Sequence, residues 1–156
     1  MTSKKIYLVF ILHLLFSTMA FSQWQLRKAQ FNHEDALALQ GYDPVAYFTQ
    51  GKAVKGSEKF SINIDGLIYH CSSEQNKQLL QQNPAKYEPQ YGGWCAYAMG
   101  NTGEKVEINP ETFKIVNDKL YVFYNAYFNN TLNDWNKNEA VLKAKADANW
   151  SNYLKK

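Results

Sequence analysis

The sequence contains little cysteine, with two residues in a chain of 156. Cys71 and Cys95 lie far apart, and no Cys-x₂₋₄-Cys pair occurs. A closed structural zinc site takes four nitrogen, sulfur or oxygen ligands, often from such pairs. The histidines that could add to the cysteines, His33 and His70, are equally scattered. The sequence therefore argues against a zinc-finger type of protein.

The chain also lacks a basic cluster. Its formal net charge is +3, and two of its lysines, Lys4 and Lys5, lie near the N-terminus. Such a weakly charged chain is not expected to bind nucleic acid.

Common catalytic signatures are absent as well. No glycine-rich phosphate loop ends in Gly-Lys-Ser/Thr, and Gly-x-Ser-x-Gly does not occur. The acidic pair Glu34–Asp35 and the neighbouring His33 are expected on the solvated surface. A thiolate pair of Cys95 with His70 is the one catalytic arrangement left. The sequence points away from an enzyme without excluding one.

The first 22 residues have the three parts of a secretory signal peptide. Lys4 and Lys5 supply the positive charge, residues 6–16 the apolar stretch, and residues 20–22 the small residues before a cleavage site. We expect cleavage before Gln23 and a periplasmic or secreted protein. The apolar stretch is too short for a good transmembrane helix, so no membrane partner is expected after cleavage. An uncleaved anchor is the alternative.

Residues 23–38 are expected to form an N-terminal arm with a short helix. Asp43 can then cap a helix over Pro44–Phe48, with proline at the first helical position. Apolar residues alternate over Glu58–Ile64, which predicts a half-buried strand. The next two residues, Asp-Gly, are a strong hairpin signal, and Leu67–Cys71 is expected to return as the second strand.

A helix over Glu74–Gln82 is predicted after that hairpin, capped by one of the two preceding serines. Further on we expect a strand over Lys105–Ile108 and a second hairpin from residues 113–116 and 120–124. The last segment is helical, with apolar residues at spacings of seven and four: Trp135, Leu142, Ala146, Trp150 and Leu154.

These elements predict one α+β domain over residues 39–156. It has a small antiparallel sheet of two β-hairpins, short helices and a long C-terminal helix.

The run Tyr91–Met99 combines a Gly-Gly pair, three large aromatics and two sulfur atoms. If the run turns helical after the glycines, Cys95 and Met99 lie at i and i+4 on one face. Copper(I) prefers such soft ligands. We therefore name Cys95 and Met99, helped by His70 or Cys71, as candidate metal ligands and copper as the candidate cofactor. In the contrasting interpretation, Met99 fills the core and Cys95 packs as a small buried hydrophobe.

Two more hypotheses concern the same region. An exported protein can keep a disulfide, so Cys71 and Cys95 could be bridged. Aromatic side chains with polar tips often line small-ligand pockets, although they more often form a core. The aromatic residues near the Gly-Gly pair are Tyr42, Tyr47, Tyr87, Tyr91, Trp94 and Tyr97.

Parts of the sequence resemble the YHS domain family over about residues 39–100. The segments with matching order and spacing are Gly41–Phe48, Asp65–Ser73 with Asn83–Tyr87, and Tyr91–Tyr97. An exported subgroup of this family is similar through Lys145–Trp150. The resemblance implies the scaffold and suggests metal handling, with binding of a small ligand or protein without metal as the alternative.

The family's short form is presumed to bind metal through three cysteines. On this chain those positions fall on Ala46, Ser72 and Asn76, so all three thiolates are absent. Cys71 occupies a position where the family pattern has Phe, and Cys95 belongs to a Gly-Gly-aromatic-Cys-Ala motif of the exported subgroup. The family's usual metal assignment therefore does not carry over.

Overall fold

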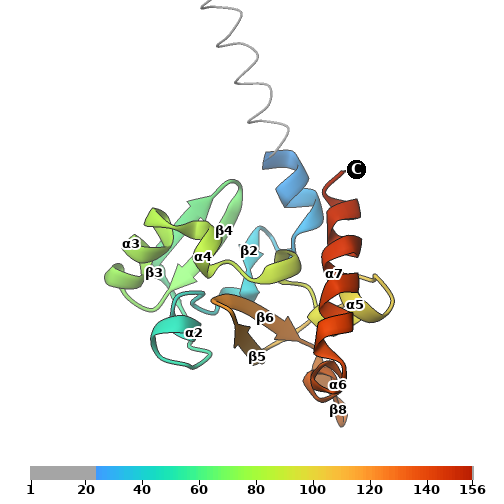
Figure 1. Ribbon diagram of the computed structural model, residues 1–156. Helices are drawn as coiled ribbons and strands as arrows, with labels where there is room; N and C mark the ends of the chain where they lie inside the picture. The colour runs from blue at the N-terminus through green and yellow to red at the C-terminus, as the bar shows by residue number, and fades with distance from the viewer. Residues whose placement is uncertain (1–23, 156) are drawn as a thin grey trace, which may run out of the picture.

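The computed structural model describes residues 24–155 (Figure 1). The predicted signal peptide and its cleavage site before Gln23 lie outside the described residues. The described chain is α+β with small sheets and a long C-terminal helix, which confirms the predicted class. Within residues 24–155 no helix is both long and apolar enough to cross a membrane.

The first predicted hairpin is present. Strands β3 (Ser57–Ile64) and β4 (Leu67–Cys71) pair antiparallel across Asp65–Gly66. Two further strands, β1 (His33–Glu34) and β2 (Leu37–Ala38), extend this sheet to the order β1-β2-β4-β3, with β2 parallel to β4. Part of the predicted N-terminal arm is therefore a sheet edge. Strands of two residues are too short to show the alternation that identifies a strand in a sequence.

The second predicted hairpin is also present, but in a separate sheet. It consists of β5 (Asn109–Val116) and β6 (Lys119–Phe123), and a third small sheet joins β7 (Asn125–Ala126) to β8 (Asn129–Asn130). The strand predicted over residues 105–108 does not form. Its carbonyl groups instead accept hydrogen bonds from elsewhere, and Val106 O accepts one from Cys95 N.

Short helices connect these sheets. They are η1 (Leu39–Gly41), α2 (Ala46–Thr49), α3 (Glu74–Gln82), α4 (Pro84–Tyr87), η2 (Gln90–Gly93) and α5 (Ala96–Asn101), and residues 24–30 are helical as well. The predicted bounds of α3 are correct, because Ser73 Oγ accepts from Asn76 N and caps it. The C-terminal segment divides at Asn138 into α6 (Thr131–Lys137) and α7 (Glu139–Tyr153).

The buried residues form three neighbouring clusters. A sheet cluster lies among β2, β4, α3 and α4, and a helix cluster lies among β6, α5, α6 and α7. A central cluster between them gathers residues of η1, α2 and β6. In Figure 1, β5 and β6 accordingly lie between the sheet side of the molecule and α7.

Four two-residue hairpin turns occur in the described chain, and both turn residues have positive φ in each. Asp65–Gly66 and Asn117–Asp118 carry residues that tolerate this left-handed conformation. Asp35–Ala36 and Tyr127–Phe128 each include residues for which it costs about 1–2 kcal/mol. Among the four hairpin turns, these two carry the residues least suited to their conformation.

The turn Tyr91–Gly93 is left-handed over three consecutive residues, with φ values of 55°, 61° and 84°. Its Gly92 faces Trp150 of α7 so closely that an added Cβ would lie 2.6 Å from Trp150 Cη2. Phe31 packs edge-on against the same indole. The Gly-Gly pair therefore allows close approach of α7 and of the N-terminal segment.

We expect Gly92→Ala to lower the free energy of unfolding by about 2–4 kcal/mol, because it adds a steric clash to the left-handed penalty. Gly51→Ala is the matched control. Gly51 has a similar φ of 63°, and an added Cβ would meet nothing within 4 Å. The control should lose only about 1–2 kcal/mol. Urea unfolding measures both, and equal losses would contradict the close packing at Gly92.

Candidate functional site

The Cys95 thiol is fully buried in the central cluster. Helix α5 begins at Ala96, so Cys95 is the residue before the helix, with φ −57° and ψ 116°. Its Sγ accepts a hydrogen bond from Tyr124 N at 3.3 Å and lies 3.4 Å from Thr131 Oγ1. The thiol thereby joins the start of α5 to the end of β6 and the start of α6.

Met99 packs elsewhere, in the helix cluster with Trp135. Cys95 O accepts a hydrogen bond from Met99 N at 3.0 Å, so the two residues stand at i and i+4 as predicted, but their side chains pack in different clusters. Cys71 lies in the sheet cluster, and both cysteines are free, so the disulfide hypothesis does not hold here. His70 occupies the face of β4 opposite Tyr69, as the alternation predicts.

The three sulfur-bearing side chains thus lie in three different clusters. Among residues 24–155, no group of three or more His, Cys, Asp or Glu side chains could hold a metal ion. Cys71 also resists deprotonation to the thiolate, because burial and the nearby Asp43 carboxylate raise the pKa of its thiol from 9.0 to about 12. Metals bind the thiolate form of cysteine.

A carboxylate network occupies the positions that the YHS resemblance assigns to metal-binding cysteines. Asp43 is fully buried, and its Oδ1 accepts from the N–H groups of Val45 at 2.8 Å and Ala46 at 3.4 Å. Its Oδ2 accepts from Ser72 N at 2.7 Å, from Ser72 Oγ at 2.6 Å and from Asn76 Nδ2 at 2.6 Å. Ala46, Ser72 and Asn76 therefore do meet in space, around an oxygen acceptor rather than as thiolates.

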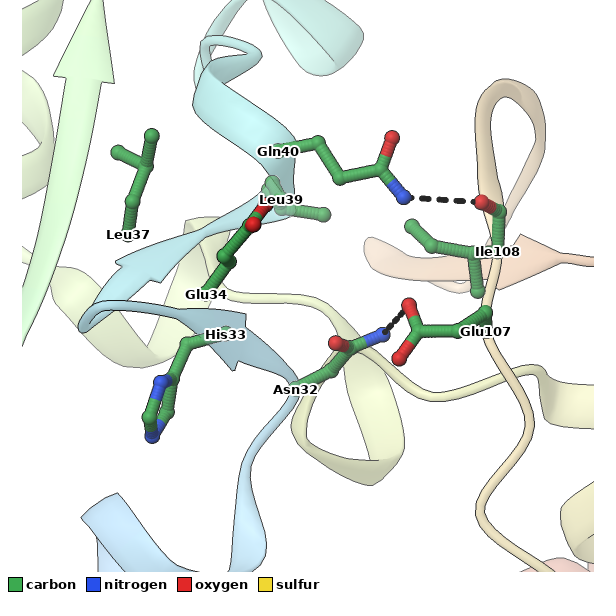
Figure 2. Close-up of a pocket in the computed structure, with 8 residues that line it drawn as sticks. All are labelled: Asn32, His33, Glu34, Leu37, Leu39, Gln40, Glu107 and Ile108. Atoms are coloured by element: carbon green, nitrogen blue, oxygen red, sulfur yellow. Dashed lines mark hydrogen bonds between the residues drawn. The ribbon is translucent and has the colours of Figure 1, made fainter.

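A cavity of about 290 Å³ lies between β1, η1 and the segment before β5 (Figure 2). Its size is at the lower end of the roughly 300–1,000 Å³ of ligand pockets. Its walls combine apolar, amide and acidic side chains, and no lysine or arginine among residues 24–155 lines it. The lining residues are Asn32, His33, Glu34, Leu37, Leu39, Gln40, Glu107 and Ile108.

Two carboxylates reach the cavity from opposite walls, Glu34 from β1 and Glu107 from the segment before β5 (Figure 2). Asn32 Nδ2 donates to Glu107 Oε2 at 3.3 Å and to Gly93 O at 3.2 Å. The Glu34 backbone pairs with Leu37 in the sheet, but its carboxylate accepts no hydrogen bond from another residue of the described chain. Gln40 Nε2 donates to Ile108 O at 3.0 Å and ties the two walls together. The cavity therefore offers acceptors and negative charge above an apolar wall.

His33 has a structural part in this wall. Its Nδ1 accepts from Ala36 N at 3.2 Å, and its Nε2 lies 2.7 Å from Lys28 O. Only a ring that carries its proton on Nε2 makes both hydrogen bonds. Figure 2 shows the ring turned away from the space between Glu34 and Glu107. His33 therefore holds the Asp35–Ala36 turn and is not available as a ligand.

From the sequence we expect Glu34 and His33 on the solvated surface; Glu34 is exposed and His33 half-buried, and the sequence did not single out Asn32 or Glu107. None of the aromatic residues proposed for a pocket lines this cavity, and Tyr47, Tyr87 and Tyr91 are core residues. The aromatic run affects the cavity indirectly, through a hydrogen bond to one of its lining residues. Gly92 O accepts from Asn32 N at 2.8 Å, so the Gly-Gly turn positions one wall.

Comparisons with family models, curated proteins and solved structures found no match to this chain.

Replacement of the buried acceptor tests the network around Asp43. We expect Asp43→Ala to lower the free energy of unfolding by about 3 kcal/mol or more, because buried donors of α2 and α3 lose their partner. Glu58→Ala, at an exposed position of β3, should stay within about 0.5 kcal/mol of the original protein. Urea unfolding followed by circular dichroism measures both. A loss for Asp43→Ala no larger than that of the control would contradict the role of the network.

The raised pKa of Cys71 predicts a pH dependence. Between pH 9 and 12 the folded thiol keeps its proton while the unfolded thiol loses it, so stability falls as the pH rises through this window. We expect the free energy of unfolding to decline by up to about 1.4 kcal/mol more between pH 9 and pH 10 than in Cys71→Ala. Urea titrations at each pH measure this slope, and parallel slopes would refute the prediction.

Proposed function

We propose that this chain is an exported module of the YHS type that binds a small organic cation in the cavity between β1, η1 and residues 107–108. The observation that carries the proposal is the pair of carboxylates, Glu34 and Glu107, on opposite walls of a cavity without a lysine or arginine. An ammonium or guanidinium group between them would meet charge-assisted acceptors on both sides. The wall of Leu37, Leu39 and Ile108 would cover the apolar part of the same ligand.

The backbone of the cavity wall supports this proposal. Asp35, Ala36, Leu39 and Gln40 all have positive φ, with values between 50° and 72°. Four such residues within six positions are costly for a chain without glycine there. Strain of this kind concentrates at ligand clamps, where the surrounding structure holds it in place.

Soft-metal handling is the weaker proposal on this geometry. A copper ion would have to reach a fully buried Cys95 whose sulfur already accepts a backbone hydrogen bond. Met99 and Cys71 pack in other clusters. Copper would therefore need the core to open before it could bind.

Ligand binding can be tested by thermal unfolding and calorimetry with putrescine, using 1,4-butanediol as the neutral control of the same length. We expect putrescine to raise the melting temperature by about 5–10 °C at a hundredfold excess over its Kd. The diol should have no effect, since it has no charge for the carboxylates to bind. Glu34→Gln and Glu107→Gln should each weaken binding by about tenfold, which corresponds to about 1.4 kcal/mol.

Glu58→Gln is the matched control variant, because Glu58 is exposed on β3 and does not line the cavity. It should bind putrescine as the original protein does. Equal stabilisation by putrescine and the diol, or unchanged binding by both cavity variants, would overturn the proposal. Stabilisation by copper(I) alone that disappears in Cys95→Ser would overturn it in favour of the metal.

A further inference from the structure

The turn between β7 and β8 exposes two adjacent aromatic side chains. Tyr127 is 91% exposed and Phe128 is 111% exposed, whereas the other exposed large hydrophobics, Val141 and Leu154, reach 47% and 42%. The turn lies at the end of the molecule opposite the N-terminal helix, beside α6 (Figure 1). No other part of the described chain presents so much apolar surface at one point.

The backbone makes this exposure unfavourable for the isolated protein. Tyr127 and Phe128 have φ values of 51° and 67°, in a turn type that favours Asn-Gly. Bulky aromatic residues are strained in this conformation and gain no contacts in return. Residues whose local conformational preference conflicts with the fold are expected at functional sites.

The base of the hairpin is held firmly. Thr131 donates to Tyr124 O through its N–H at 3.1 Å and through its hydroxyl at 2.9 Å. Asn125 Nδ2 donates to Thr112 Oγ1 at 2.9 Å and connects the hairpin to β5. The two rings are therefore presented on a braced hairpin instead of a loose loop.

The hairpin and the start of α6, residues 124–133, contain no charged residue. Asn125, Asn129 and Asn130 flank it, and the nearest charges along α6, Asp134 and Lys137, pair with each other at 2.6 Å. An anionic surface or partner would find no unpaired lysine or arginine on this hairpin or on α6. The tip therefore suits an uncharged environment with an apolar interior and a polar boundary.

A protein partner fits these observations less well. Two aromatic side chains bury about 150–250 Å² each, whereas a stable protein interface needs roughly 800 Å² on each side. The asparagines around the tip add little apolar area to reach that value. A convex tip also needs a matching pocket in a protein, while a fluid bilayer adapts to it.

We propose that the Tyr127–Phe128 tip inserts reversibly into the interface of a zwitterionic phospholipid bilayer. The more exposed Phe128 would reach the acyl chains, and the Tyr127 hydroxyl would remain at the headgroups, where tyrosine is enriched. The flanking asparagines would hydrogen-bond at the polar boundary. Residues before Gln23 play no part, so this membrane contact differs from the predicted signal peptide.

Sedimentation with phosphatidylcholine vesicles tests this proposal. The exported protein is used, and its N-terminus is verified by mass spectrometry because a retained signal peptide would bind vesicles by itself. We expect weak binding, with an association constant no greater than the roughly 10⁴ M⁻¹ of a single myristoyl chain. Binding should change little between about 0.05 and 0.5 M NaCl, since no charge attraction is involved.

The double variant Tyr127→Asn, Phe128→Gly removes both rings and restores the residues that this turn type favours. It should keep or raise the melting temperature and lose vesicle binding by at least about tenfold. Val141→Ala and Leu154→Ala are matched controls in the C-terminal segment and should bind as the original protein does. Absence of binding by the original protein, unchanged binding by the double variant, or binding to anionic vesicles alone would each overturn the proposal. Self-association through the tip in ultracentrifugation, without vesicle binding, would also overturn it.

Discussion

The buried carboxylate of Asp43 is the interaction on which the arrangement of the sheet side depends. It joins the start of α2, the end of β4 and the start of α3 through donors that have been removed from water. A buried charge is tolerated only when such donors surround it. Burial, and after it the same carboxylate, raises the pKa of the neighbouring Cys71 thiol, so this region also keeps that cysteine protonated.

A second set of contacts positions the N-terminal segment beside the cavity. The Gly-Gly turn approaches α7 closely, and its carbonyl groups bind Asn32, which in turn contacts Glu107. The aromatic run therefore contributes to a site without lining it. Its sulfur atoms serve packing: Cys95 accepts a backbone N–H, and Met99 fills the helix cluster.

The two hairpin turns with an unfavourable backbone conformation lie at the two proposed binding regions. Asp35–Ala36 connects the strands beside the acidic cavity, and Tyr127–Phe128 forms the aromatic tip. The other two turns carry Asp-Gly and Asn-Asp, which suit their conformation. Backbone strain and its proposed functional use thus occur together before β2 and shortly before α6.

Local chemistry in the sequence was enough to determine both long hairpins, the bounds of α3 and the helical C-terminus. Each of these depends on residues within a few positions of one another. The helix predicted over Pro44–Phe48 with Asp43 as cap is instead Ala46–Thr49 and has no side-chain cap. The cavity, the edge strands β1 and β2, and the separation of Cys71, Cys95 and Met99 depended on tertiary structure. Glu34 and Glu107 are 73 positions apart, and no local pattern connects them. Likewise, the hydrogen bond from Cys95 N to Val106 O, just before α5, joins two segments that only the folded chain brings together.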